Sequence, residues 1–187
     1  MDKELVRARI QEIGIIPGVR VASAEHARYA AETLHRAGIP IVEITMTVPE
    51  ALDVISGLAQ SLPEMIVGAG TVLDVETAQR CVNAGARFLT STGFVPEVVE
   101  FARKKGVLVI PGALTPSEVI QAWKAGSDFV KIFPCGPPRR RQLHPGFEGA
   151  VSANSIDRHR RRESADRSSL HPGRSIRAGR GQRTNPQ

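Results

Sequence analysis

Strand-like and helix-like segments alternate six times within residues 1–134, with a repeat of roughly 20 to 25 residues. The strand-like segments are short apolar runs, which are typical of strands buried on both faces. Most of the helical segments between them end at a glycine, and another short helix is expected over residues 4–13. This alternation predicts a parallel sheet covered by helices. The expected strands are residues 15–19, 41–45, 65–69, 88–91, 107–110 and 128–134.

Two architectures satisfy this pattern, a doubly wound sheet and a (β/α)8 barrel. A dinucleotide-binding doubly wound sheet carries Gly-x-Gly-x-x-Gly after its first strand, and the chain has no such turn there. A barrel places its chemistry at the carboxyl ends of several strands. Reactive residue types fall at those ends, which favours the barrel: Glu43, Thr45, Thr71, Ser91, Thr92 and Lys131.

The last expected strand, residues 128–134, contains a single lysine, Lys131, among apolar neighbours. Burying an unpaired ammonium is costly, so a buried lysine is neutral, paired or reactive. Desolvation makes a lysine a Schiff-base nucleophile towards carbonyl substrates. An edge-strand lysine that reaches water along its stem explains the same pattern equally well.

Glu43 lies on another predicted strand and is expected to face the same carboxyl end of the barrel as Lys131. A lysine and a carboxylate are the minimum for amine catalysis, because the lysine forms the imine while the carboxylate moves protons. Taken alone, Glu43 is more often a solvated or salt-bridged strand-end carboxylate. Thr71 alone is equally explained as a turn residue.

Three segments together resemble the signatures of the aldolases that act on 2-dehydro-3-deoxy-6-phosphogluconate (KDPG) and 4-hydroxy-2-oxoglutarate (KHG). They are Ile-Val-Glu-Ile-Thr at 41–45, Val-Gly-Ala-Gly-Thr-Val-Leu at 67–73 and Phe-Val-Lys-Ile-Phe-Pro at 129–134, and Ile-Pro-Gly at 110–112 fits too. The resemblance covers roughly residues 5–135. It implies a class I aldolase on a (β/α)8 barrel, without metal or cofactor and usually trimeric. It also implies that Lys131 is the Schiff-base lysine, Glu43 the general acid/base, and Thr71 and Phe133 part of the substrate pocket.

The chain departs from that family pattern at two positions. Thr47 stands where KDPG-cleaving members typically carry an arginine that grips the substrate carboxylate. A hydroxyl cannot replace a bidentate guanidinium, and Arg20 at the end of the first strand is a candidate to supply the charge. Thr92 occupies a place where the family often has proline. The identity of the 2-keto acid substrate therefore stays open.

Charge separates residues 136–187 from the rest of the chain. Residues 139–187 hold twelve arginines and four acidic residues, which is a net charge of +8. The remaining residues carry −2, and the total charge is +6. Few apolar residues and no periodicity predict a disordered basic segment. The tail can be back-translated with suitable synonymous codons and then translated one base further on. The result contains Thr-Gly-Gly and Leu-Gly-Val-Gly segments, like those expected of the missing seventh and eighth strand–helix units. We therefore predict an incomplete barrel of about six units over 1–135 and an aberrant, frameshifted tail over 136–187.

The expected activity is cleavage of a 2-keto-4-hydroxy acid to pyruvate and an aldehyde, so the expected partner is a small 2-keto acid. Two cysteines and the lack of an apolar targeting or membrane-spanning run favour the cytoplasm. Nucleic-acid binding is disfavoured, because Phe147 alone accompanies the arginines. The alternatives are a non-catalytic truncated barrel whose basic tail binds polyanions, and a phosphate-handling barrel enzyme in which Lys131 binds charge.

Overall fold

The computed structural model describes residues 2–135 of the 187-residue chain. The predicted basic segment over 136–187, and with it the frameshift hypothesis, lies outside the described residues. Within residues 2–135 strands and helices alternate as expected. The strands are β1 (Gly18–Val19), β2 (Ile41–Thr45), β3 (Ile66–Gly70), β4 (Phe88–Thr90), β5 (Leu108–Ile110), β6 (Gly112–Ala113) and β7 (Lys131–Ile132). The helices are α1 (Lys3–Ile13), α2 (Ala24–Arg36), α3 (Ala51–Ser61), α4 (Val75–Asn83), α5 (Pro96–Lys105) and α6 (Pro116–Lys124).

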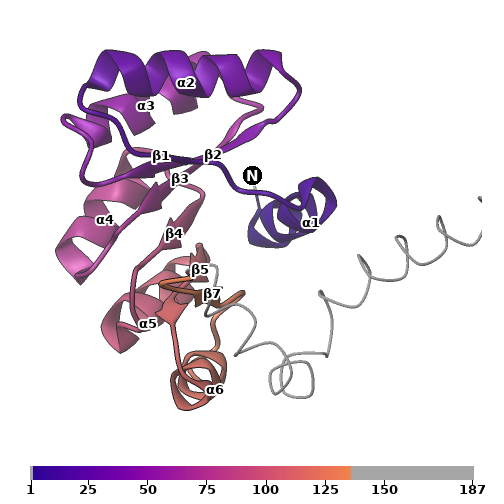
Figure 1. Cartoon of the computed structure of the whole chain (residues 1–187), viewed down its shortest axis with the longest axis vertical. Helices are drawn as coiled ribbons and strands as arrows, with labels where there is room; N and C mark the ends of the chain where they lie inside the picture. Colours follow the sequence, from indigo (N-terminus) through magenta and orange to yellow (C-terminus); the bar gives the residue numbers. More distant parts are fainter. Residues whose placement is uncertain (1, 136–187) are drawn as a thin grey trace, which may run out of the picture. The chain divides into compact units, whose positions relative to one another are not determined.

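All strand pairs are parallel. Five strands form one sheet in the order β1-β2-β3-β4-β5, so each strand lies beside the next one in the sequence (Figure 1). The short strands β6 and β7 pair with each other. This order is the one expected when strand–helix units wind continuously in one direction. The predicted parallel sheet is therefore confirmed.

Three strands differ most from the sequence-based expectation. The lysine strand, expected over residues 128–134, is only Lys131–Ile132. The first strand is only Gly18–Val19, because Pro17 before it has no N–H to donate, although its carbonyl accepts from Glu43. A strand that was not expected, β6, follows β5 after Pro111. The Pro111 carbonyl accepts from the Lys131 N–H at 2.9 Å, so this interrupted segment still aligns the lysine strand.

Local signals explain where several helices begin and end. Ser23 and Asp74 cap α2 and α4 by accepting from the backbone N–H three residues on. Thr115 and Glu118 form the capping box that the sequence predicts for α6, and the backbone N–H of Thr115 lowers the pKa of the Glu118 carboxyl. Helix α5 ends at Gly106, whose φ of 65° is easily adopted only without a side chain.

The strands separate two apolar clusters. Side chains such as Val42, Ile44 and Leu89 pack against α2 to α5, which line the outer face of the strands (Figure 1). Alternate side chains point the other way and pack with α1, which lies apart from the other helices: Ile41, Ile66, Phe88, Leu108 and Ile110. The period of two in each strand therefore assigns one set of residues to the helical layer and the other to the inner face.

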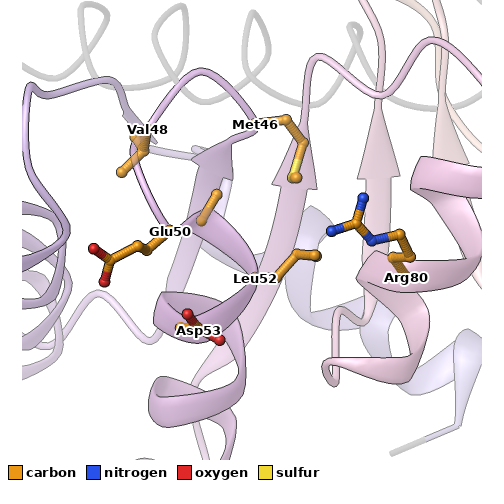
Figure 2. A pocket seen from close by; sticks show the side chains of 7 residues that line it. Met46, Val48, Glu50, Leu52, Asp53 and Arg80 are labelled. Carbon is orange, nitrogen blue, oxygen red and sulfur yellow. The ribbon is translucent and has the colours of Figure 1, made fainter.

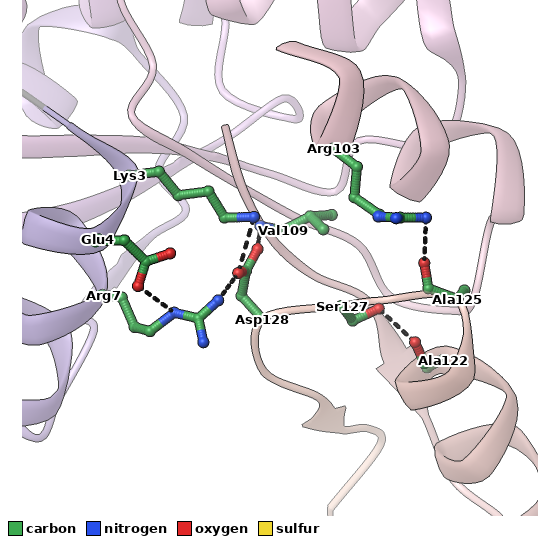
Figure 3. Close-up of polar contacts among 9 residues, drawn as sticks. All are labelled: Lys3, Glu4, Arg7, Arg103, Val109, Ala122, Ala125, Ser127 and Asp128. Carbon is green, nitrogen blue, oxygen red and sulfur yellow. Dashed lines mark hydrogen bonds and ion pairs between the residues drawn. The ribbon is translucent and has the colours of Figure 1, made fainter. Parts of the chain in front are cut away.

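Helix α1 is tied to the lysine segment through Asp128, whose side chain is 1% exposed. Lys3 Nζ lies 3.0 Å from Asp128 Oδ1, Arg7 donates to the same oxygen, and the Val109 N–H donates to Oδ2 at 3.0 Å (Figure 3). The Asp128 N–H in turn donates to the Val109 carbonyl at 3.1 Å. These bonds join α1, β5 and the start of the lysine segment at one end of the strands.

No helix within residues 2–135 is both long and apolar enough to cross a membrane.

Candidate functional site

The inner face of the strands changes from apolar to polar along the chain direction. On β2 the inner side chains are Ile41, then Glu43, then Thr45, while Val42 and Ile44 face the helices. The Cα partner of Glu43 on β1 is Gly18, and on β3 it is Gly68. The carboxylate is thus carried by the middle of a buried strand, and its direction follows from the alternation of the strand.

Two glycines of β3 make room on the inner face. A Cβ at Gly68 would collide with the ring of Phe88, and a Cβ at Gly70 would collide with the carboxyl group of Glu43. Both glycines point inward, because Val67 and Ala69 pack with the outer helices. The Val-Gly-Ala-Gly segment therefore leaves a gap in the inner layer of β3 that Phe88 and the Glu43 carboxylate fill.

Lys131 and Glu43 come together as predicted. Lys131 Nζ lies 3.9 Å from Glu43 Oε2, and the Glu43 side chain is 10% exposed. The ring of Phe133, two residues further along, has its centroid 5.4 Å from the same ammonium. Of the two alternatives for this lysine, the structure shows a partly buried one, since the Lys131 side chain is 34% exposed and Phe133 is 37% exposed. The ammonium is therefore accessible from one side and backed by a carboxylate and an aromatic ring on the others.

The predicted substrate-contacting residues form two further pairs near the strand ends. Arg20, exposed beyond β1, donates to Thr71 Oγ1 at 3.4 Å. Thr71 has a φ of 62°, an unusual conformation for a β-branched residue. Thr47 is exposed, and its hydroxyl lies 2.9 Å from that of Thr45.

Thr92 takes another position. It is half-buried after β4, and its backbone carbonyl group occupies the space that a Cβ on Gly112 would need. Within residues 2–135 its side chain makes no hydrogen bond to Lys131 or Glu43. The hydroxyl of Ser91 beside it turns back to the Gly93 carbonyl at 2.6 Å. The structure therefore places Thr92 in the loop that β6 packs against, outside the lysine–glutamate pair.

One residue of the site was missed by sequence reasoning. Thr90 at the end of β4 donates to Glu43 Oε2 at 2.9 Å, and both residues are buried. The available signal was the period of two on β4, because Phe88 and Thr90 share a face. The second missed feature is the inward placement of Gly68 and Gly70, which was readable from the same alternation.

Other reactive groups lie away from this cluster. Burial raises the pKa of the Cys81 thiol to about 11, which leaves it protonated and unreactive near neutral pH. A separate pocket of about 310 Å³ lies beside α3 and α4, where Met46, Leu52 and Arg80 approach one another while Glu50 points away (Figure 2). None of the residues lining it is a predicted site residue. Among residues 2–135 no three His, Cys, Asp or Glu side chains gather in a way that would hold a metal ion.

Comparison with known proteins adds to this geometry. The family model described as KDPG and KHG aldolase matches residues 6–138. The chain belongs to this family. The resemblance read from the three sequence segments is therefore confirmed.

Individual relatives agree with the family assignment. The 2-dehydro-3-deoxy-phosphogluconate aldolase of Treponema pallidum is 37% identical over 125 residues, which are 67% of this chain and 60% of the relative. The KHG/KDPG aldolase of Escherichia coli (strain K12) is 34% identical over 120 residues, covering 64% of this chain and 56% of the relative. The chain thus matches little more than half the length of these relatives.

The solved structure of a KDPG aldolase matches the fold of this chain. The KDPG aldolase of Legionella pneumophila, with pyruvate captured at low pH as a covalent carbinolamine intermediate, is 31% identical with a TM-score of 0.62. The match covers 68% of this chain and 64% of that one. The predicted fold class, a (β/α)8-barrel type, is confirmed. Residues 2–135 of this family member provide five strand–helix units and the lysine strand of a sixth.

Proposed function

We propose that this chain acts as a class I aldolase that cleaves a 2-keto-4-hydroxy acid to pyruvate and an aldehyde. Candidate substrates are 2-dehydro-3-deoxy-6-phosphogluconate and 4-hydroxy-2-oxoglutarate. The observation that carries the proposal is the 3.9 Å separation of Lys131 Nζ and Glu43 Oε2 on the inner face of the strands. Membership of the aldolase family and the names of its relatives support it. So does the covalent carbinolamine of the Legionella relative.

In this proposal Lys131 is the nucleophile. Its neutral amine attacks the C2 carbonyl of the substrate to form a carbinolamine, which loses water to become a protonated imine. Glu43 accepts the proton of the C4 hydroxyl while the bond between C3 and C4 breaks and its electron pair moves towards the iminium nitrogen. The aldehyde leaves, the remaining enamine takes a proton at C3, and hydrolysis of the imine releases pyruvate and the free lysine. No metal or cofactor takes part.

The groups at the rim are assigned to substrate binding. We assign the ring of Phe133, beside the ammonium at 5.4 Å, to the wall of the pocket around the reacting carbon. Arg20 and Thr71, joined at 3.4 Å, are the cation and hydroxyl best placed to bind an anionic group of the substrate. Thr47 and Thr92 complete the proposed set, Thr47 at the position expected for a carboxylate-binding arginine. A Thr47→Arg variant that gains kcat/KM on 2-keto acids would support its placement at the carboxylate end.

Beyond the site, we propose that the chain forms a homotrimer if its barrel is complete, as the family resemblance implies, and that it lies in the cytoplasm. We further propose that residues 1–135 are the catalytic barrel portion and that residues 136–187 are a separate segment produced by a change of reading frame. The nucleotide sequence of the gene tests the last point. If reading one base on from about codon 137 encodes no strand–helix units, the frame change is excluded.

Reductive trapping tests the activity. Incubating the 187-residue chain with pyruvate and borohydride should attach the reduced three-carbon adduct to Lys131, located by peptide mapping. Lys131→Ala should abolish the adduct, while Lys124→Ala, which removes an exposed lysine of α6, should retain it. A chain that forms no adduct, or an adduct that survives Lys131→Ala, would refute Lys131 as the Schiff-base residue.

A further inference from the structure

The two oxygens of the Glu43 carboxylate have different surroundings. Oε1 lies over Gly70, where an added Cβ would overlap it, and a Cβ at Gly18 would stand 3.9 Å from it on the other side. Oε2 accepts from the Thr90 hydroxyl at 2.9 Å and lies 3.9 Å from Lys131 Nζ. Oε1 therefore occupies the space left by Gly70 and Gly18, whereas Oε2 is held by the hydrogen bond from the Thr90 hydroxyl.

The contact between Thr90 and Glu43 crosses a whole strand. Glu43 is on β2 and Thr90 on β4, and β3 lies between them in the sheet. Neighbouring strands are about 4.8 Å apart, so the two side chains must meet above β3. Gly70 leaves the space in which they meet, since a Cβ there would strike the carboxylate. The hydrogen bond therefore depends on residues of three successive strands.

The donor in this hydrogen bond is held rigidly. Thr90 is 3% exposed, and its carbonyl accepts from the Val72 N–H at 3.0 Å, while β4 is paired with β3 and β5. A β-branched side chain has few χ1 choices, so a fixed backbone also fixes the hydroxyl. An ionised carboxylate only accepts hydrogen bonds, which makes the hydroxyl the donor.

Thr90 is a nearer partner of the Glu43 carboxylate than Lys131 is. A direct charge-assisted bond from an ammonium to a carboxylate is about 2.7 to 2.9 Å long. Lys131 Nζ and Glu43 Oε2 are instead 3.9 Å apart, while Oε2 is engaged by Thr90. The Glu43 carboxylate therefore accepts from Thr90 and lies beside the Lys131 ammonium without a direct hydrogen bond to it.

We propose that Thr90 is a positioning residue of the aldolase reaction, acting through Glu43. Its hydroxyl sets the rotation of the carboxylate so that Oε2 faces the atoms bound to Lys131. This inference rests on the proposed function, because it assigns Thr90 to proton transfer by Glu43 at a substrate carbon.

Pyruvate alone allows the proposal to be tested, since two of its reactions can be compared in the 187-residue chain. Borohydride trapping reports the imine on Lys131. Exchange of the pyruvate methyl protons for deuterium reports the later step, in which a base removes a C3 proton from that imine to give the enamine. We expect Thr90→Val to slow exchange about 10- to 100-fold relative to the amount of imine trapped. Thr90→Ser, which keeps the hydroxyl, should restore the ratio to within about threefold.

Ser127→Ala is the matched control. It also removes a buried hydroxyl, since Ser127 is 7% exposed, but this hydroxyl donates to the Ala122 carbonyl at 2.8 Å instead of to Glu43. This variant should leave the ratio of exchange to trapping unchanged. If Ser127→Ala lowers the ratio as much as Thr90→Val, or if Thr90→Val leaves it unchanged, the positioning role is overturned.

A measurement on the ligand-free chain separates this inference from the proposed function. The side-chain carboxyl carbon signal of Glu43, assigned with Glu43→Gln in a 13C-glutamate-labelled chain, should move in Thr90→Val and return in Thr90→Ser. An unmoved signal overturns the inference even if the chain forms the imine. A signal that moves in a chain that never traps pyruvate refutes the proposed aldolase function, and with it the catalytic role of Thr90, while the contact itself stands.

Discussion

Asp128 and Lys131 lie three residues apart, yet the two charges are held in different ways. The Asp128 side chain is 1% exposed, forms an ion pair with Lys3 at 3.0 Å and accepts from Arg7 and the Val109 N–H, so its oxygens are well satisfied (Figure 3). Lys131 is 34% exposed and lies 3.9 Å from its nearest carboxylate. The first arrangement satisfies a buried charge, whereas the second leaves a charge incompletely paired and open to a ligand.

The difference follows from position along the parallel strands. Asp128 precedes β7 and joins α1 to β5 at the amino ends, whereas Lys131 and Glu43 point into the space towards the carboxyl ends. In barrels of this type the amino end contributes stability and the carboxyl end carries chemistry. Substitutions at the two ends should therefore change different measured quantities.

The largest expected effect is on activity. Glu43→Gln keeps an oxygen that can accept from Thr90 but removes the proposed base, so we expect kcat for cleavage of 4-hydroxy-2-oxoglutarate to fall about 10³-fold. The free energy of unfolding, measured in urea, should change by less than about 1 kcal/mol. A large loss of stability with kcat preserved would show that the two ends do not divide these roles.

Asp128→Asn should produce the opposite result. The amide loses the charge that Lys3 and Arg7 face, and breaking such a buried ion pair should lower the free energy of unfolding by about 3 kcal/mol. Pyruvate trapping on Lys131 should persist below the unfolding transition. Loss of trapping in a chain that circular dichroism shows to be folded would contradict this separation.

Gly70→Ala tests the space above β3. The added methyl group would overlap the Glu43 carboxyl, so the carboxylate must move, and we expect kcat to fall about 10- to 100-fold. Gly57→Ala on α3 is the control, because a Cβ there meets no atom within 4 Å. Equal activity of the two variants would show that the position of the carboxylate does not limit the reaction.

The smallest expected effect comes from Lys3→Met. Arg7 and the Val109 N–H still satisfy Asp128 after this change, so the free energy of unfolding should fall by only about 1 kcal/mol. Chemical denaturation of the two variants in parallel measures the difference from Asp128→Asn. A loss as large as that of Asp128→Asn would mean that Lys3 alone supports the buried carboxylate.

The sequence by itself determined the order of the elements and the residues of the central pair. Short apolar runs predicted β2 over Ile41–Thr45 with the bounds that the structure has, and helical segments ending at glycine predicted the helices between the strands. The residue types at the strand ends, together with the three family-like segments, singled out Lys131 and Glu43. Such signals are local, because strand alternation and helix capping are encoded within a few residues.

Only the tertiary structure decided how those residues are supported. The hydrogen bond from Thr90 to Glu43 spans three strands. The contacts of Asp128 with Lys3 and Arg7 join residues more than a hundred positions apart in the sequence. The exposure of Lys131 likewise depends on what packs around β7. These features depend on which distant side chains meet across the sheet, and spacing along the chain does not encode such contacts. The sequence therefore names the two groups of the proposed reaction, and the packing of the strands sets their distances and orientations.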